Sequence, residues 1–159
     1  MQEVFAITKV QSADLPELLA LYRHLIPDDP ALDIFDAERI FSRFQAMGDN
    51  AIYLGRVGKQ VTCSCTLVVV PNLTRGGSPY GLIENVITHS AHRGQGLGKK
   101  ILTYAVKAAW QLDCYKVMLL TGSKKSATLA FYQSCGFEAS KTGFQIRRIA
   151  KRPDEATLG

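Results

Sequence analysis

The first half of the chain alternates apolar and polar positions in ways that predict a strand and two amphipathic helices. Val4–Val10 alternates with a period of two, which is typical of a half-buried strand. Ser12, followed by acidic residues, is a helix-start signal, and apolar side chains recur behind it at helical spacing as far as Ile26. Pro27–Pro30 ends that helix, and a second helix is expected over Asp36–Met47.

The middle of the chain predicts three strands followed by a long helix. Ala51–Val57 and Gln60–Val70 are expected to pair as a hairpin around a Gly-Lys turn. Tyr80–Thr88 is a largely apolar strand interrupted by polar residues at its centre. After a glycine-rich segment, Leu97–Leu112 has the apolar stripe of an amphipathic helix.

The last third predicts further strands and one more helix. Val117–Leu120 is a short apolar run of the buried-strand kind, and Ser126–Cys135 is expected to be helical. Phe137–Ala139 and Phe144–Ile149 are expected as the last strands, before a polar tail, Lys151–Gly159. The order β-α-α-β-β-β-α-β-α-β-β predicts a mixed α/β fold with one central sheet.

Charge divides the chain into an acidic and a basic part. The 159 residues are 47% hydrophobic, as in an ordinary globular domain, and carry a net charge of +5. Residues 1–84 hold 7 Lys and Arg against 10 Asp and Glu, whereas residues 85–159 hold 12 against 4. The basic excess therefore predicts an anionic partner for the second half: a nucleotide, a nucleic acid or a membrane surface.

The cysteines and the N-terminus indicate a cytoplasmic protein. Cys63, Cys65, Cys114 and Cys135 lie in apolar stretches, and C-x-C is not a usual zinc spacing, so buried thiols in a reducing compartment are expected and no metal site is predicted. The first residues lack the basic and apolar regions of a signal peptide, and no apolar run approaches the ~20 residues of a membrane span.

A glycine-rich turn between a strand and a helix is the sharpest chemical signal. The first N–H groups of a helix lack partners, and glycines let an anion approach them, so phosphate is the natural ligand. The dinucleotide fingerprint fails because Lys99 stands in place of its last glycine, and the Walker pattern fails at Arg93 and Lys100. The pattern R/Q-x-x-G-x-G/A is satisfied in full by Arg93, Gly94, Gln95, Gly96, Leu97 and Gly98. A glycine-rich loop without a ligand is the alternative.

The segments around this turn complete a resemblance to a known family. Leu82–Thr88 resembles the fourth strand of the GNAT superfamily of acetyl-CoA-dependent N-acyltransferases, and Ser126–Phe137, with Phe131-Tyr132 followed by a Gly-Phe pair, resembles its final motif. Gly81–Asn85 and Asp113–Lys116 look closest to glucosamine-phosphate N-acetyltransferases. The resemblance implies a GNAT-type domain over residues 1–150 with a splayed central sheet, and transfer of an acetyl group from acetyl-CoA to the primary amine of a small molecule.

The resemblance also implies where acetyl-CoA binds. Its pyrophosphate would lie against the backbone N–H groups of Arg93–Gly98, and Lys99 and Lys100 would add charge unless they are only solvated helix-start residues. Its pantetheine arm would pair with the backbone of Val86, Ile87 and Thr88, along a strand splayed by a bulge. An N–H group, that of Val86 or a neighbour, would polarise the thioester carbonyl.

Two catalytic residues are implied. Tyr132 would protonate or hydrogen-bond the departing thiolate, since a phenol with a pKa of about 10 is a suitable donor; otherwise it is a core aromatic. Glu84 interrupts an apolar strand, where partial burial would suit a base acting through water; otherwise it holds a loop or binds substrate. His89 and His92 are secondary candidates. Many family members carry an Asn before the Phe-Tyr pair, but Ser123–Ser126 has none.

The acceptor and the partners are less specified. The loop Pro27–Asp36 carries four Asp, which favours a cationic amine but also fits a solvated loop. Aminosugars, polyamines, amino acids, antibiotics and peptides all stay open as acceptors. The expected partners are acetyl-CoA and this amine, without nucleic acid or membrane, and a homodimer is left open. A non-catalytic acyl-CoA-binding module is the alternative function, and nucleic-acid binding is the least favoured.

Overall fold

Five strands form one mixed sheet in the computed structural model, which describes residues 3–150. The strands are β1 (Phe5–Lys9), β2 (Ala51–Val57), β3 (Gln60–Val70), β4 (Tyr80–Thr88) and β5 (Val117–Leu119). Neighbours in the sheet follow chain order, and every pair is antiparallel except β4 with β5, which is parallel. A parallel pair needs a crossover, and helix α3 (Leu97–Gln111) supplies it.

The chain divides into two compact units, residues 1–119 and residues 120–159. The first contains the sheet together with α1 (Leu15–Tyr22), α2 (Ile34–Gln45) and α3. The second contains α4 (Ser126–Ser134). The polar tail predicted for Lys151–Gly159 lies outside the described residues.

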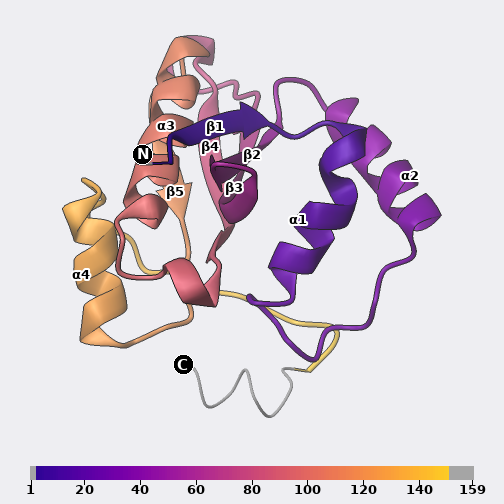
Figure 1. Ribbon diagram of the computed structural model, residues 1–159. Coiled ribbons are helices and arrows are strands. Elements are labelled where there is room, and N and C mark those ends of the chain that lie inside the picture. The colour runs from indigo at the N-terminus through magenta and orange to yellow at the C-terminus, as the bar shows by residue number, and fades with distance from the viewer. Residues whose placement is uncertain (1–2, 151–159) are drawn as a thin grey trace. The chain divides into compact units, whose positions relative to one another are not determined.

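In the first unit, helices cover both faces of the sheet. Figure 1 shows α1 and α2 on one side and α3 on the other. The core between the sheet and the first two helices consists of Val10, Leu15, Leu18, Leu21, Ala37, Phe41, Leu54 and Ile87. On the opposite face the thiols of Cys63 and Cys65 lie 3.8 Å from backbone carbonyl oxygens of α3. Apolar burial on both faces therefore fixes the sheet between its helices.

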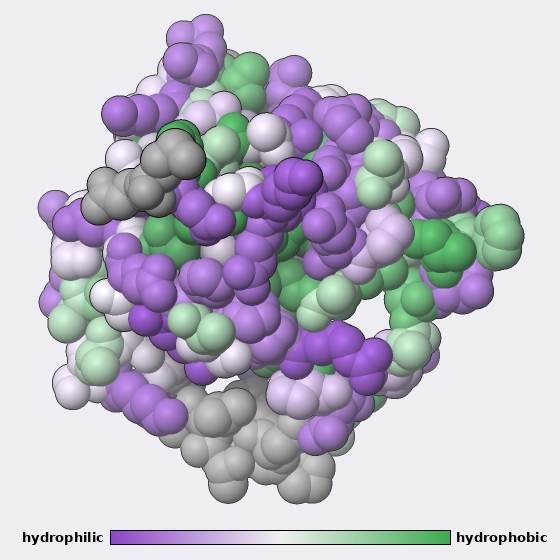
Figure 2. Space-filling model, in the orientation of Figure 1, coloured by the Kyte–Doolittle hydropathy of each residue, from purple (hydrophilic) through white to green (hydrophobic). Residues whose placement is uncertain are grey.

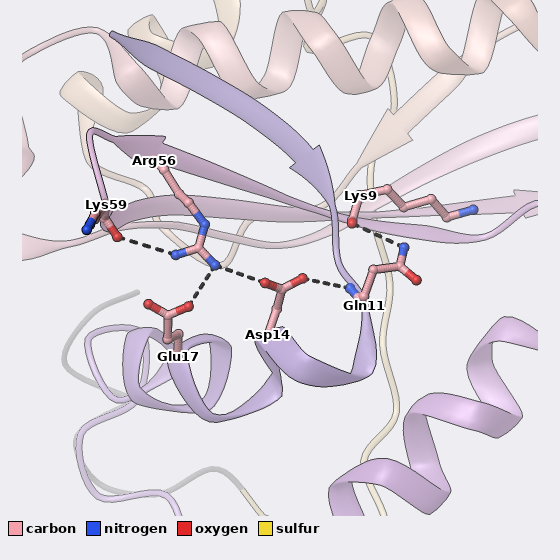
Figure 3. A network of polar contacts seen from close by, with 6 residues as sticks. All are labelled: Lys9, Gln11, Asp14, Glu17, Arg56 and Lys59. Atoms are coloured by element: carbon pink, nitrogen blue, oxygen red, sulfur yellow. Dashed lines mark hydrogen bonds and ion pairs between the residues drawn. The ribbon is translucent and has the colours of Figure 1, made fainter. Parts of the chain in front are cut away.

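A charged network attaches the start of α1 to the sheet. Arg56 of β2 donates to the carboxylates of Asp14 and Glu17, at 2.9 and 2.7 Å (Figure 3). Asp14 also accepts from the backbone N–H of Gln11, which closes the short 3-10 helix that precedes α1. Since the Arg56 and Asp14 side chains are only 20% and 23% exposed, this pair is shielded from solvent better than the exposed pair between Arg39 and Asp36.

Most of the predicted elements are confirmed, with shifted ends. β2, β3 and β4 have the predicted bounds. The first helix ends at Tyr22 rather than continuing to Ile26, so the loop before α2 is longer than expected. α2 begins two residues earlier than predicted, because the Asp33 side chain caps it by accepting from the N–H of Phe35 at 2.9 Å.

The two last predicted strands are wrong. Phe137–Ala139 and Phe144–Ile149 have no strand conformation, and the described part of the chain after α4 is irregular. A strand needs a partner for its backbone groups and a surface for its apolar side chains. Phe144 and Ile146 are 92% and 100% exposed, so alternation of apolar residues alone does not make a strand here.

The surface of the described residues mixes both kinds of side chain. Figure 2 shows a mostly hydrophilic face with hydrophobic residues gathered where Figure 1 places α2, whose exposed apolar residues are Phe35 and Ile40. No helix within residues 3–150 is long and apolar enough to cross a membrane.

Replacing Arg56 by Lys tests the attachment of α1. Lysine is a point charge and cannot bind two carboxylates with a planar fork, so Arg56→Lys should lower the free energy of unfolding by about 1 kcal/mol. The hydrogen bond from Arg56 lowers the pKa of Glu17. The ionised Glu17 therefore stabilises the fold at every pH above the ordinary pKa of a glutamate, and this stabilisation is lost as the pH falls through the lowered pKa of the folded protein. Denaturant unfolding at pH 7 and pH 3 measures both effects.

Arg39→Lys is the matched control, because Arg39 forms an exposed ion pair within one helix. It should leave the free energy of unfolding within about 0.5 kcal/mol of wild type. Equal losses in the two variants would show that the network does not attach α1.

Candidate active site

A bulge divides β4 into two halves. On β3, Thr66 lies opposite Glu84 and Ser64 lies opposite Ile87. Between these two pairs β4 therefore contains one more residue than β3. Asn85 adopts a φ of +50°, which an Asn tolerates better than most residues and which a bulge requires. The bulge that the resemblance implies is therefore present at the centre of the strand.

Beyond the bulge, one edge of β4 is open. β5 pairs only with the first half of β4, from Gly81 to Ile83. The N–H of His89, directly after the strand, donates to the carbonyl of Thr62 on the β3 side. Because successive N–H groups of a strand point to opposite sides, those of Thr88 and Val86 point to the side that β5 leaves unpaired. An extended ligand can add there as a further strand.

The open edge leads into the glycine turn. Gly94 and Gly96 have φ of +76° and +75°, a conformation that other residues adopt only with strain, and space is open where a Cβ would lie. Gly96 is the N-cap of α3 and has no side-chain hydrogen bond. The first helical bond runs from Lys100 N to Gly96 O, so the N–H groups of residues 97–99 have no partner within the helix. The turn therefore has the donors and the room that a pyrophosphate needs.

The side chains around the turn differ from what the sequence suggests. Arg93 does not extend freely, because its guanidinium donates to the carbonyl oxygens of Thr88 at 3.3 Å and His24 at 3.5 Å. Lys99 and Lys100 are both exposed, and the Nζ of Lys100 lies 5.3 Å from the centre of the Phe5 ring. Arg93 thus connects the glycine turn to the loop after α1.

Three histidines gather beside the turn. The rings of His24 and His89 are 4.0 Å apart, and those of His89 and His92 are 5.6 Å apart. The pKa of His89 is lowered by desolvation and by the nearby charges of His24, His92 and Arg93, in that order. His89 Nδ1 accepts from the N–H of Ala91, which requires that nitrogen to be unprotonated. His89 therefore caps the short 3-10 helix Ser90–His92, which precedes the glycine turn, and His24, which the sequence did not single out, packs against it.

Glu84 faces the side of the sheet that α1 covers. It lies opposite Thr66, two residues from Ser64, whose own partner Ile87 packs in the core under α1. The Glu84 side chain is exposed, so the partial burial expected from its apolar strand is wrong. The bulge at the next residue, Asn85, interrupts the regular strand at this point, and both residues are exposed there.

Tyr132 lies on α4, in the second unit. It is half-buried between Phe131 and Phe137, with ring centroids 5.2 and 6.3 Å away. Burial raises its pKa, with a smaller contribution from Cys135, so the hydroxyl keeps its proton at neutral pH. Tyr132 therefore has the protonation state that a donor to a thiolate needs.

The segment before α4 has no Asn, as read from the sequence. In its place Ser123 accepts from the N–H of Lys125 at 3.3 Å and donates to the hydroxyl of Thr128 at 3.1 Å. The Ser123 hydroxyl thus holds this turn through two hydrogen bonds. Lys124 and Lys125 lie between Ser123 and the first residue of α4. Within the acidic loop, Asp33 caps α2 and Asp36 pairs with Arg39, so these two carboxylates have structural roles.

Burial protects the two thiols of β3. Burial raises the pKa of Cys63 to about 11 and that of Cys65 to about 12. Cys114 is buried as well, whereas Cys135 is only half-buried, and none of the four is in a disulfide. The expectation of buried thiols is therefore confirmed for three of them.

Comparison with known proteins places this geometry in a family. A family model described as the acetyltransferase (GNAT) family matches residues 18–137, which span both compact units. A glucosamine 6-phosphate N-acetyltransferase of Trypanosoma brucei brucei is 32% identical over 137 residues, which cover 86% of this chain and 91% of that protein.

Solved structures agree on the fold. A putative acetyltransferase from Agrobacterium tumefaciens has a TM-score of 0.86 and 43% identity, covering 90% of this chain and 99% of its own. A glucosamine-6-phosphate N-acetyltransferase from Arabidopsis thaliana has a TM-score of 0.83 at 22% identity, covering 92% and 100%, and shows the fold alone. Relatives named as enzymes favour an acyltransferase over the non-catalytic module that the sequence left as an alternative.

Proposed function

The chain belongs to the acetyltransferase (GNAT) family, and we propose that it transfers the acetyl group of acetyl-CoA to the primary amine of a phosphorylated amino sugar. Acetyl transfer to an amine is the activity of its family and of its named relatives. The observation that carries the coenzyme part is the open second half of β4, which leads into the partnerless N–H groups of α3. The acceptor class rests on the Trypanosoma relative, named as a glucosamine 6-phosphate N-acetyltransferase.

Acetyl-CoA supplies an activated thioester and several phosphate charges to this site. The N–H groups of Gly94–Gly98 would hold the pyrophosphate at the start of α3, where the helix dipole favours an anion. The N–H of Arg93, also expected to contribute, instead donates to the carbonyl of Ser90 at 3.4 Å. Lys99 would add a charge. The backbone around Val86, Ile87 and Thr88 would align the pantetheine arm as an added strand, and the open N–H of Val86 would stabilise the carbonyl oxygen as it gains charge.

The remaining chemistry needs a base and an acid. Glu84 would take the proton of the acceptor ammonium, since it is exposed on the face where a polar acceptor can approach. Tyr132 would give a proton or a hydrogen bond to the departing thiolate, which its raised pKa allows at neutral pH. His89 and His92 would hold the backbone before the glycine turn rather than react, because the Nδ1 of His89 is occupied in capping the 3-10 helix Ser90–His92.

The setting of the enzyme is part of the proposal. Four unpaired thiols among the described residues support a reducing compartment, the cytoplasm. A homodimer would cover the exposed Phe144 and Ile146, and we include it as a prediction. We expect neither nucleic acid nor a membrane to be a partner.

A thiol-release assay tests the activity and the acceptor together. With acetyl-CoA, glucosamine 6-phosphate should release CoA faster than unphosphorylated glucosamine, spermidine or a free amino acid.

Tyr132→Phe should lower kcat about tenfold or more with little change in the KM for acetyl-CoA, because it removes a donor used only as the thiolate departs. Tyr104→Phe, on the exposed face of α3, is the matched control and should match wild type.

Each part of the proposal has its own contradicting outcome in that assay. Tight acetyl-CoA binding without release of CoA for any amine would contradict the activity. Release with spermidine alone would overturn the amino-sugar acceptor. A Tyr132→Phe rate equal to wild type would remove Tyr132 from the mechanism.

Glu84→Gln tests the base. Glutamine keeps the shape but cannot take a proton, so kcat at pH 7 should fall by about a hundredfold. The loss should shrink toward pH 9, because solvent then deprotonates the amine without help. The kcat of both forms measured from pH 6 to 9 gives the comparison. A loss of the same size at every pH would assign Glu84 to substrate binding instead.

A further inference from the structure

One residue of the loop after α1, His24, makes three contacts with the segment that leads into the glycine turn. Its ring packs 4.0 Å from the ring of His89. Its Nδ1 lies 3.3 Å from the hydroxyl oxygen of Ser90, and its carbonyl oxygen accepts from Arg93 at 3.5 Å. We call these three contacts the histidine link. The link joins the loop after α1 to the backbone that carries the proposed phosphate site.

His89 also holds the backbone on its own side of the link. Its Nδ1 accepts from the N–H of Ala91 at 3.2 Å and so caps the 3-10 helix Ser90–His92. The N–H of Arg93 closes that helix by donating to the carbonyl of Ser90, and the glycine turn begins at the next residue. The cap of His89 therefore fixes the backbone from which the turn starts.

The cap works in only one protonation state of His89. An imidazole nitrogen accepts a hydrogen bond through its lone pair, so Nδ1 cannot accept once it carries a proton. The groups that act on His89 are His24 from the loop after α1, His92 from the same 3-10 helix and Arg93 directly behind it. Each is a cation when protonated, so each opposes a positive charge on His89.

We propose that the histidine link makes acetyl-CoA binding sensitive to pH, because it holds the glycine turn only while His89 is neutral. Below about pH 6.5 an imidazole takes up a proton. The Nδ1 of His89 then loses the bond from Ala91, and charge on both rings drives His24 and His89 apart. The backbone before the turn is freed, and ordering it again costs part of the binding free energy of the coenzyme. This inference rests on the proposed function and assigns His24 and His89 as positioning residues.

The direction of the pH effect distinguishes the link from a direct phosphate ligand. A protonated imidazole that bound the coenzyme phosphates would form a charge-assisted hydrogen bond, and acetyl-CoA would then bind more tightly in acid. The link predicts weaker binding in acid, since protonation releases the turn.

His89→Asn tests the link. Asparagine is a favoured cap whose side-chain oxygen can accept the same N–H, and it does not titrate. The dissociation constant of acetyl-CoA, measured by isothermal titration calorimetry at pH 7.5 and pH 5.5, should rise about fivefold more in wild type than in His89→Asn, as expected for the loss of one cap. Protonation of the coenzyme itself affects both proteins alike and cancels in the comparison.

Two further variants assign the effect to the link. His24→Ala removes the ring contact and the contact with Ser90, so its dissociation constant at pH 7.5 should move toward the wild-type value at pH 5.5. His92→Asn is the matched control, because His92 lies in the same 3-10 helix with its ring 5.6 Å from that of His89 and does not cap it. It should keep the pH dependence of wild type.

The melting temperature without ligand gives a readout that does not depend on coenzyme binding. Desolvation and then the charges of His24, His92 and Arg93 lower the pKa of His89. Neutral His89 therefore stabilises the fold above the ordinary pKa of a histidine, and this stabilisation is lost as the pH falls from there through the lowered pKa. The Tm of wild type should fall more than that of His89→Asn between pH 7.5 and pH 5.5, and equal falls would overturn the proposal.

The same measurements separate this inference from the proposed function. A wild-type protein that binds no acetyl-CoA at pH 7.5 contradicts the function, and the two Tm values still test the link. Equal pH dependence of acetyl-CoA binding in wild type and His89→Asn contradicts the link alone, and so does tighter binding by wild type in acid.

Discussion

The proposed site depends on one constraint: β4 and β5 stop pairing after three residues. β5 follows β4 only from Gly81 to Ile83, and the bulge at Asn85 then bends the strand. Continued pairing would occupy the N–H groups of Val86 and Thr88. The parting leaves them open, in line with the start of α3. An unsatisfied sheet edge is normally a liability, and here it is the surface on which a long ligand can lie.

The same bulge links the coenzyme side of the site to the acceptor side. Glu84 precedes it and is exposed on the face that α1 covers, while the backbone beyond it runs to the glycine turn. Arg93 and the His24–His89 contact join that turn to the loop after α1, and Arg56 attaches the start of α1 to the sheet. The two ends of α1 are therefore tied to the strands around the site, which restricts the position of the acceptor face.

Much of this arrangement was predictable from the sequence, because local patterns encode it. The three central strands have their predicted bounds, and the motif Arg93–Gly98 lies at the start of α3 as expected. Phe144–Ile149 shows the limit, since its alternation is real but pairing is a property of the whole fold. The exposure of Glu84 was missed for a similar reason: an apolar strand predicts burial, and the bulge that overrides it depends on the φ of Asn85.

The hydroxyl groups of Tyr22, Ser64 and Thr66 meet under α1, which was also missed, although the chain contains part of the signal. Residues 62, 64 and 66 are hydroxyl-bearing and alternate with apolar residues and thiols along β3, so they line one face of the sheet. Tyr22 was taken only as an apolar position of a helix. Which face α1 would cover, and where its last tyrosine would meet β3, depends on contacts between segments far apart in the chain.

The most direct test of the account is the dissociation constant of acetyl-CoA for Gly96→Ala, measured by isothermal titration calorimetry. Gly96 and Gly76 both have a positive φ with open space beyond, so alanine strains the backbone alike at both positions. The account predicts binding weakened about tenfold or more by Gly96→Ala and unchanged by Gly76→Ala, since only Gly96 lies in the turn that holds the phosphates. Equal affinity in all three proteins would contradict it.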